Sequence, residues 1–401
     1  MKNLKIDEKL KKIVDNKKIL RILFLAAILL LAIAARYFAY SYKSGDYEIF
    51  LKPWYDKIIE LGKIKSLKYK IGDYNVPYMF ILAIFSYIPI SPLILIKTLS
   101  VIFDVILAIY SSKLVYEFIK SNKNAILISD ICFGVILFLP TVFMNSAVWA
   151  QCDSIYTTFI IMSLYYLKKD KVLASFILLG IAFAFKLQFI FILPIYILLY
   201  FKRDDISILH FIIIPVVNVL MCLPAIIMGR RIKDCLLIYF SQTGTYNSLT
   251  LNYPNLYSLF GEVFQNQSKV LVLFTIAIIG MISFYLFYRK AKINDNIIKI
   301  GLMLVMITVY FLPRMHERYG FLAEILAVIY VFIYRQKFSL PVILQLSALS
   351  GYFMFLGEFD NLFFKLFSLF VFFAIFKFII DTLKSLEYNE TKYLKCKNIL
   401  K

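Results

Sequence analysis

The sequence is poor in the residues on which several common kinds of site depend. Its 401 residues include two histidines, two tryptophans and five cysteines: Cys132, Cys152, Cys222, Cys235 and Cys396. The cysteines are scattered and form no C-x-x-C pair, so neither a zinc site nor a disulfide framework is indicated. The G-x-x-x-x-G-K-[ST] and G-x-G-x-x-G motifs are also missing, which argues against a nucleotide site. We therefore expect neither a metal nor a cofactor.

Acidic residues are scarce as well. The chain has 25 Asp and Glu against 45 Lys and Arg, which gives a formal charge of +20. The basic residues are mostly lysines and lie in short loops between apolar runs. This distribution is typical of loops beside a membrane and does not indicate a nucleic-acid partner.

Apolar residues are abundant. They make up 61% of the chain, and the mean hydropathy is +0.78. Apolar runs of about 15 to 25 residues recur from end to end, and only helices satisfy every backbone group in lipid at that spacing. We expect an all-α polytopic protein of the cell membrane, one domain over 1–401, with about 12 spans. The expected spans are 20–40, 93–118, 124–140, 154–167, 172–186, 188–201, 207–228, 270–288, 297–313, 319–334, 338–356 and 361–380.

The orientation of these spans follows from the lysines in the short loops. The segment 76–90 is apolar but short for a spanning helix. If it stays outside, the basic loops all fall on the side of the N-terminus, as expected for the cytoplasm. Both termini, including the tail 381–401, are then cytoplasmic, and the loops 41–92 and 229–269 are extracytoplasmic. The first apolar run is expected to be an uncleaved signal anchor.

The first external loop carries the first candidate for chemistry. Asp46 follows the first span closely, and Glu48 lies two positions further on. A partly desolvated carboxylate at a membrane surface can act as a general base. Alternatively, Asp46 is a solvated loop aspartate, and on residue chemistry alone this is the stronger reading. The aromatics Trp54 and Tyr55 suit either a sugar site or an interfacial belt.

Two further external segments carry polar side chains. In the first, Gln151 and Asp153 can hydrogen-bond a sugar, and Trp149 either lines that site or anchors the interface. In the second, Lys186 and Gln188 interrupt an apolar stretch, where a lysine is costly without a partner. Three other candidates for binding lie in external loops: Asp73, Tyr253 and Asn255. A further acid, Asp104, lies within the second expected span and is more easily explained as a structural partner inside the bundle.

A cluster of charges lies at a span boundary near residue 316. Arg314 and Arg318 are four positions apart and would share a helix face, with His316 and Glu317 between them and Tyr319 beyond. Arginine forks match phosphate oxygens, so the cluster favours a phosphate site. The alternative is a pair of arginines that snorkel to lipid headgroups.

Taken together, these segments resemble the polytopic glycosyltransferases of the C superfamily (GT-C), in particular bacterial membrane proteins related to the eukaryotic GPI-anchor mannosyltransferase II. The matching segments keep their order along the chain. They are Gly45-Asp46-Tyr47 with Phe50-Leu51-x-Pro53-Trp54-Tyr55, Gly72-Asp73-Tyr74-Asn75-x-Pro77-Tyr78, Asn145-Ser146-x-Val148-Trp149-x-Gln151-Cys152-Asp153-Ser154, Phe185-Lys186-Leu187-Gln188 and Pro313-Arg314-Met315-His316-Glu317-Arg318-Tyr319. One departure is Ala150, where the family pattern leads us to expect glycine.

The resemblance implies a bundle with a large first extracytoplasmic loop that carries surface helices. It also implies transfer of a sugar, mannose or another hexose, from a polyprenyl-phosphate donor to a glycan or lipid acceptor, with inversion and with Asp46 as base. Arg314, His316, Arg318 and Lys186 are the candidates for binding the lipid phosphate. Two alternatives stay open: a transporter or flippase of a lipid-linked sugar, and a polymerase or ligase of surface polysaccharide. No internal repeat of the kind common in transporters is visible in the sequence.

Overall fold

The computed structural model describes residues 16–239, 248–261, 263–289, 293–355 and 361–399, the last thirteen of these by backbone alone. The described chain is all-α apart from two strands of two residues each. The elements are α2 (Lys17–Tyr37), η1 (Tyr47–Leu51), α3 (Lys52–Glu60), η2 (Lys63–Lys68), α4 (Val76–Phe85), α5 (Pro92–Ile119), α6 (Ala125–Phe138), α7 (Pro140–Phe143), η3 (Met144–Val148), α8 (Asp153–Lys168), α9 (Val172–Phe185), η4 (Leu187–Ile192), α10 (Leu193–Tyr200), α11 (Ile208–Met221), α12 (Leu223–Ile227), α13 (Ile232–Leu236), β1 (Thr250–Leu251), α14 (Leu256–Phe260), η6 (Gln265–Gln267), α15 (Ser268–Tyr288), η7 (Asn294–Asn296), α16 (Ile297–Phe311), β2 (Met315–His316), α17 (Phe321–Tyr334), α18 (Ser339–Phe355) and α19 (Asn361–Ile399).

Several helices are long and apolar enough to span a membrane. Within the described ranges there are five of them, or six if the bent pair α6 and α7–η3 counts as one span. The five are Lys17–Tyr37, Pro92–Ile119, Gln265–Tyr288, Asn294–Phe311 and Asn361–Leu386. The bend of 50° in the pair follows from Pro140, because the residue before a proline is pushed out of the helical conformation.

The outer helices expose apolar side chains where a water-soluble protein would expose polar ones. In α2, Leu30 is 67% and Leu31 is 64% exposed, and in α15 Phe284 is 69% exposed. Contiguous apolar surface of this kind marks contact with lipid or with a partner protein. A protein surrounded by lipid fits this pattern.

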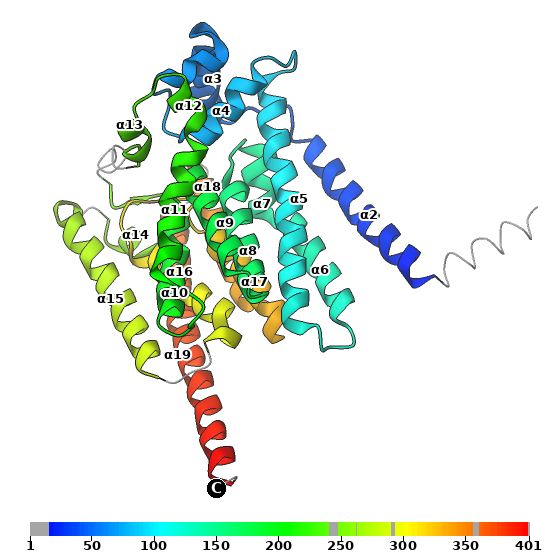
Figure 1. Cartoon of the computed structure of the whole chain (residues 1–401), viewed down its shortest axis with the longest axis vertical. Helices are drawn as coiled ribbons and strands as arrows, with labels where there is room; N and C mark the ends of the chain where they lie inside the picture. Colours follow the sequence, from blue (N-terminus) through cyan, green and yellow to red (C-terminus); the bar gives the residue numbers. More distant parts are fainter. Residues whose placement is uncertain (1–15, 240–247, 262, 290–292, 356–360, 400–401) are drawn as a thin grey trace, which may run out of the picture.

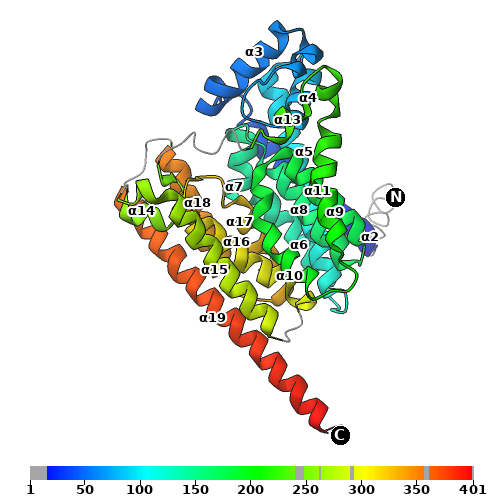
Figure 2. The same cartoon turned by 60° about the vertical axis from the view of Figure 1, so that its left-hand side comes forward.

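The helices form a bundle with two distinct ends (Figure 1). At one end lie α3, α4, α12 and α13, while α19 ends at the opposite one. Within this end, α4 packs against α3, η2 and α12. The apolar helix α4 therefore lies with these surface elements at the same end of the bundle. On its flanks the bundle carries α2 on one side, with α15 and α19 on the other (Figure 2).

The chain between residues 170 and 203 is a hairpin of two short helical segments. Arg203 follows α10 and pairs with Asp170, which precedes α9, at 3.0 Å. The chain therefore returns to the end from which α9 started, and the turn lies at Lys186, whose backbone is extended (φ −154°). A pair of short helical segments, close to the expected 172–186 and 188–201, therefore describes this stretch.

Three connections between helices lie close together, held by Lys202 and Arg203. Lys202 donates hydrogen bonds to the carbonyls of Phe287 and Arg289, at 2.6 and 3.0 Å. Three connections that are far apart in sequence therefore meet there, those around residues 170, 203 and 289.

Two buried cations attach α2 to α5. Arg36 donates to Asp104 Oδ2 at 2.9 Å, and both side chains are almost wholly buried. Lys97 Nζ donates to the carbonyls of Ala39 and Tyr42, at 2.8 and 2.6 Å, and so holds the turns that follow α2 against α5. Asp104 thus has a structural partner inside the bundle, and that partner is Arg36.

Candidate functional site

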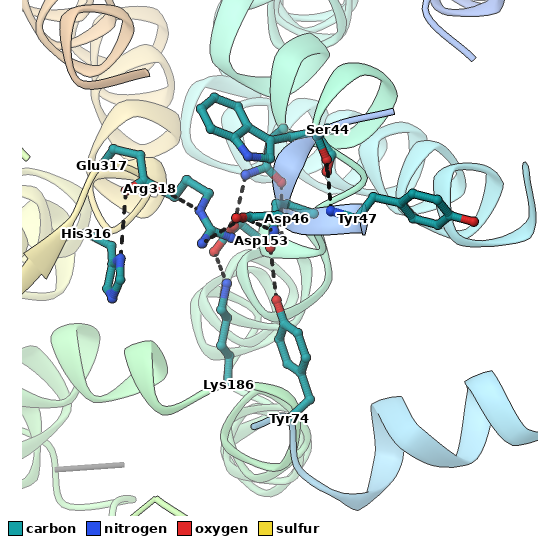
Figure 3. Close-up of polar contacts among 12 residues, drawn as sticks. Ser44, Asp46, Tyr47, Tyr74, Asp153, Lys186, His316, Glu317 and Arg318 are labelled. Atoms are coloured by element: carbon teal, nitrogen blue, oxygen red, sulfur yellow. Dashed lines mark hydrogen bonds and ion pairs between the residues drawn. The ribbon is translucent and has the colours of Figure 1, made fainter. Parts of the chain in front are cut away.

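Asp46 lies where the chain leaves the long helix α2 and turns into the surface helices. It precedes the π-helical turn η1 and is 7% exposed. Ser44 fixes this turn, because its hydroxyl donates to the Trp149 carbonyl at 2.8 Å and accepts from the Tyr47 amide at 3.2 Å. The same serine therefore joins the first loop to the segment after η3 (Figure 3).

Asp46 is held in place by a chain of hydrogen bonds. Gln151 Nε2 donates to Asp46 Oδ2 at 2.7 Å, and Tyr74 OH donates to Gln151 Oε1 at 2.9 Å. Burial raises the pKa of Tyr74 well above its usual value, so the phenol stays a neutral donor. The amide of Gln151 is thereby oriented with its NH₂ group toward the carboxylate.

Arg318 approaches the same carboxylate from the other half of the chain. Its Nη2 lies 3.4 Å from Asp46 Oδ2, and its Nε donates to Glu317 Oε1 at 2.7 Å. Burial disfavours the charge of Arg318, but Glu317, Asp153 and Asp46 outweigh burial and raise the pKa of the guanidinium well above its usual value. Arg318 is therefore a permanent cation between acids.

The two acids beside Arg318 respond to it differently. Burial raises the pKa of Asp46, and the charges of Arg318 and Lys186 only partly oppose this effect. Burial also acts on Glu317, but Arg318 and His316 prevail and lower its pKa to about 2. Glu317 thus stays ionised, whereas Asp46 holds a proton more readily than an ordinary aspartate.

A second ion pair lies beside the first (Figure 3). Lys186 Nζ donates to Asp153 Oδ1 at 2.5 Å, and Asn145 Nδ2 donates to Asp153 Oδ2 at 2.8 Å. Lys186 Nζ also lies 5.8 Å from the centre of the Tyr74 ring. Tyr74 is therefore a neighbour of both this ion pair and the hydrogen-bond chain that ends at Asp46. Lys186, which interrupts the apolar stretch, is therefore stabilised by an ion pair with Asp153, as a lysine in apolar surroundings requires.

The segment between Asn145 and Asp153 has an unusual backbone. It begins in the π-helical turn η3, and Ala150 has φ +61° in a position with no exposed surface. A left-handed conformation favours glycine, which is the residue that the resemblance leads us to expect at this position. Both π-helical turns of the described chain, η1 and η3, flank the site, as π-turns often do.

The expectation that Arg314 and Arg318 share a helix face is wrong. Residues 312–319 form a turn and the strand β2, which pairs in parallel with β1, with Thr250 opposite Met315. Arg314 has φ +64°, and its Nη2 donates to Ser268 Oγ at 3.2 Å. The two arginines therefore contact different parts of the protein, and only Arg318 reaches Asp46.

The remaining candidates lie around the site or in supporting positions. His316 lies 3.7 Å from Glu317 and packs on the Tyr319 ring. Trp149 is buried against Tyr352, with ring centres 4.8 Å apart. The buried residue Gln188 lies in the turn η4, two positions after Lys186.

Three of the candidate residues make contacts within the fold and none that is shown with Asp46. Tyr55 OH donates to the Phe85 carbonyl at 3.1 Å, which joins α3 to α4. Asn255 caps α14 by accepting from the amides of Tyr257 and Ser258. Tyr253 is buried next to Gly320.

The surface candidates belong to the first loop. Trp54 packs edge-on against Tyr74, with ring centres 5.8 Å apart. The side chains of Glu48 and Asp73 are exposed. Trp54 thereby contacts a residue of the hydrogen-bond chain to Asp46.

Sequence reasoning missed three residues that organise the site. Ser44, Tyr74 and Asn145 each hold a predicted residue or its segment in place. Tyr74 and Asn145 belong to the matched segments, so their presence there was a usable signal. Nothing in the sequence singles out Ser44.

The site combines three acids, Asp46, Asp153 and Glu317, with three basic side chains, Lys186, His316 and Arg318. Among the described residues, no group of three His, Cys, Asp or Glu side chains is placed to hold a metal ion. The arrangement can orient a hydroxyl group against Asp46 and bind an anion at Arg318 and Lys186. No protein-family model matches the chain, and no curated protein matches it either.

Proposed function

We propose that this chain is an integral-membrane glycosyltransferase. It would transfer one sugar, mannose or another hexose, from a polyprenyl-phosphate donor to the hydroxyl group of a glycan or lipid acceptor. The proposal rests on the resemblance of the matched segments to the GT-C superfamily and on the chemistry of the side chains around Asp46.

One observation carries the proposal. Asp46, Gln151 and Arg318 come from three segments far apart in sequence, yet all meet at one carboxylate oxygen, at 2.7 and 3.4 Å. A buried acid beside a fixed cation suits a reaction that takes up a proton and releases an anion. A solvated loop aspartate needs neither partner.

In the proposed mechanism Asp46 is the general base. Both of its contacts use Oδ2, and among the described residues no hydrogen bond to Oδ1 is made. Oδ1 takes the proton from the acceptor hydroxyl, and the oxygen attacks the anomeric carbon. The bond from that carbon to the phosphate oxygen breaks, and polyprenyl phosphate leaves with inversion.

The leaving group is an anion, so the protein mainly positions it and compensates its charge. Arg318 contacts Asp46 and carries a fork that matches phosphate, and the charge of Lys186 also acts on Asp46. Glu317 and Asp153 hold these two cations in place. Arg314 is a weaker candidate than Arg318 because it bonds Ser268 instead.

The proposal includes a position in the cell membrane. About 12 spans would cross it, with a GT-C-like bundle, an extracytoplasmic site and cytoplasmic termini. The helices α3, α4, α12 and α13 lie together at one end (Figure 1), and the short basic connections around residues 170, 203 and 289 lie close to one another, which supports this orientation. The count includes apolar helices of 10–17 residues, such as α9 and α17, which are short for lone spans.

The direct test uses the purified chain in detergent or vesicles. It is incubated with polyprenyl phosphates that carry different single sugars, and loss of donor and release of polyprenyl phosphate are measured. We expect one donor to be consumed, faster with a sugar acceptor than with water alone. If no donor in a panel that includes the mannosyl and glucosyl lipids is consumed, with or without acceptors, the proposal fails.

A transporter of a lipid-linked sugar remains the second candidate, because buried cations would serve it equally. The two candidates differ in the expected result of the assay. A transporter would move the donor from one leaflet of a sealed vesicle to the other and leave it chemically unchanged. A polysaccharide polymerase or ligase would instead transfer a whole glycan from its lipid carrier. The same incubation separates the three by the product formed.

A further inference from the structure

A buried arginine lies without a hydrogen-bond partner at the end of the bundle formed by α3, α4, α12 and α13. Arg230 follows α12, and its backbone is fixed by a 3.0 Å hydrogen bond from its amide to the Ala225 carbonyl. The residue is 7% exposed, and its Nη2 is enclosed by protein without a hydrogen-bond partner among the described residues. A buried guanidinium is costly unless an anion compensates its charge, so this position favours an anionic ligand.

The acid closest to Arg230 in the sequence is already paired. Asp234 in α13 accepts two hydrogen bonds from the exposed side chain of Arg231, at 2.9 and 3.1 Å. The segment 240–247 beyond α13 contains no acidic residue. The charge of Arg230 therefore stays available for a ligand.

A second cation lies beside the turn that precedes Arg230. Gly229 has φ +96°, a conformation that favours glycine, and it connects α12 to Arg230. A Cβ at this position would lie 3.8 Å from Cε of Lys68, so the lysine side chain passes close to the turn. Lys68 belongs to η2 and is exposed. The turn thus has two positive charges next to it, one enclosed by protein and one at the surface.

An exposed apolar stripe leads along α11 and α12 toward Arg230. The helix α12 lies beyond α11 at this end of the bundle (Figure 1). The members of the stripe are three or four positions apart, as on one face of a helix, and each is at least 41% exposed. They are Leu209, Ile212, Val216, Leu220, Leu223 and Ile227. Exposed apolar surface of this kind fits lipid chains, and the stripe ends three positions before the buried charge.

We propose that Arg230 binds the phosphate group of an anionic phospholipid of the membrane, with Lys68 at the rim of the site. The acyl chains lie along the apolar stripe, and the phosphate oxygens accept hydrogen bonds from the guanidinium. Arginine suits this role because its planar fork matches phosphate oxygens. The inference is independent of glycosyl transfer and stands if the chain proves to be a transporter.

The test measures lipid binding by the purified full chain in a neutral detergent. Native mass spectrometry follows titrations with phosphatidylglycerol, with phosphatidylcholine as the zwitterionic lipid and with inorganic phosphate as the free anion. We expect wild type to bind phosphatidylglycerol most tightly. Arg230→Gln should weaken the tightest phosphatidylglycerol binding by about tenfold or more, because it removes a charged hydrogen-bond donor.

Lys233→Gln is the matched control for the loss of one positive charge. Lys233 is exposed and lies three positions from Arg230, and its replacement leaves the pair of Arg231 and Asp234 intact. Exposed charges are screened by solvent and salt, so the affinity of this variant should stay within about twofold of wild type. An equal loss in both variants would reduce the site to general surface charge and overturn the role of Arg230.

Thermal unfolding separates binding from folding. Without lipid, Arg230→Gln should unfold at the temperature of wild type or above it, since it removes a buried charge without a partner. Phosphatidylglycerol should raise the midpoint of wild type more than that of the variant, because a ligand stabilises the state that binds it. A midpoint that is lower in the variant by the same amount with and without lipid would make Arg230 purely structural and overturn the proposal.

Two further results with wild type alone would overturn it, so the proposal does not depend on the folding of a variant. One is equal affinity for phosphatidylcholine and phosphatidylglycerol, which would show that the negative charge of the lipid is not recognised. The other is displacement of phosphatidylglycerol by millimolar inorganic phosphate, which would assign the site to a free anion.

Discussion

Gln151 Nε2 donates a 2.7 Å hydrogen bond to Asp46 Oδ2 across 105 positions of sequence. The same oxygen lies 3.4 Å from Arg318 Nη2, so two donors from distant segments fix one carboxylate. A base must be held in position to gain from proximity to the hydroxyl it deprotonates. The hydrogen bond from Gln151 therefore makes the position of the proposed base depend on the folding of two distant segments.

Replacement of Asp46 by asparagine tests its role as the base. Asp46→Asn keeps the size of the side chain but removes its proton affinity, so the chemical step should slow by roughly 10²-fold or more while donor binding survives. Turnover under single-turnover conditions and donor binding are measured separately. Glu48→Gln is the matched control, because Glu48 is an exposed acid two positions away. Turnover of Asp46→Asn within a few-fold of wild type would assign the base elsewhere.

The pH dependence provides a second test of the same pair. Burial raises the pKa of Asp46 and Arg318 lowers it, so removal of Arg318 should raise it further. A general base acts when it is deprotonated, so the rate falls as the pH drops through the pKa of Asp46. The acid limb of kcat/KM should therefore move to higher pH in Arg318→Gln. A limb that stays in place, or moves to lower pH, contradicts the coupling of these two groups.

Donor affinity tests Arg318 as the phosphate ligand. Arg318→Gln should weaken donor binding by about 1.5–3 kcal/mol, the usual range for a hydrogen bond to a charged group. Arg318→Lys should not restore it fully, because an ammonium lacks the planar fork. The matched control is Arg314→Gln, which should change affinity little because Arg314 bonds Ser268. Equal losses in the two variants would show that both arginines act on the lipid alike.

Much of the site could be predicted from the sequence, because unusual residues stand out against an apolar background. Asp46, Gln151, Asp153, Lys186 and Arg318 were all candidates, and the structure brings them together. Their pairing could not be predicted, since charge patterns along a chain do not say which acid meets which base. The role of each residue in a reaction stays a prediction.

The errors and omissions arise where the backbone departs from regular helix. The shared helix face of Arg314 and Arg318 fails because residue 314 has a positive φ and the next two residues pair with β1. That pairing depends on residues 65 positions away, which local periodicity does not detect. The all-α class could be predicted from the sequence, because apolar runs of this length must be helical in lipid.

The backbone at residue 150 gives a prediction about stability. Ala150 has φ +61°, and Ala150→Gly should remove the cost of this conformation, which offsets the extra chain entropy of glycine. The change in unfolding free energy should thus lie within about 1 kcal/mol of wild type. Ala150→Ile should lower the unfolding midpoint clearly, because a branched side chain fits neither this φ nor a position without exposed surface. Thermal unfolding in detergent compares them, and an isoleucine variant as stable as wild type would contradict the geometry.

The orientation in the membrane can be tested at two exposed lysines. Lys68 lies at the end of the bundle that holds α3 and α4, and Lys120 lies beyond α5, a helix of 28 residues. A straight helix of that length covers about 40 Å, more than the hydrocarbon core of a bilayer. Cysteines placed at these two positions should therefore react from opposite sides, Lys68→Cys from outside.

A membrane-impermeant maleimide is applied to intact cells and again after permeabilisation. The four described native cysteines are buried, so the wild-type chain measures the background. We expect Lys68→Cys to label in intact cells and Lys120→Cys only after permeabilisation. If both label in intact cells, the segment 41–92 does not end on the side opposite Lys120. The helix α4 or α5 would then cross the bilayer differently, and Asp46 would lose its proposed extracytoplasmic position.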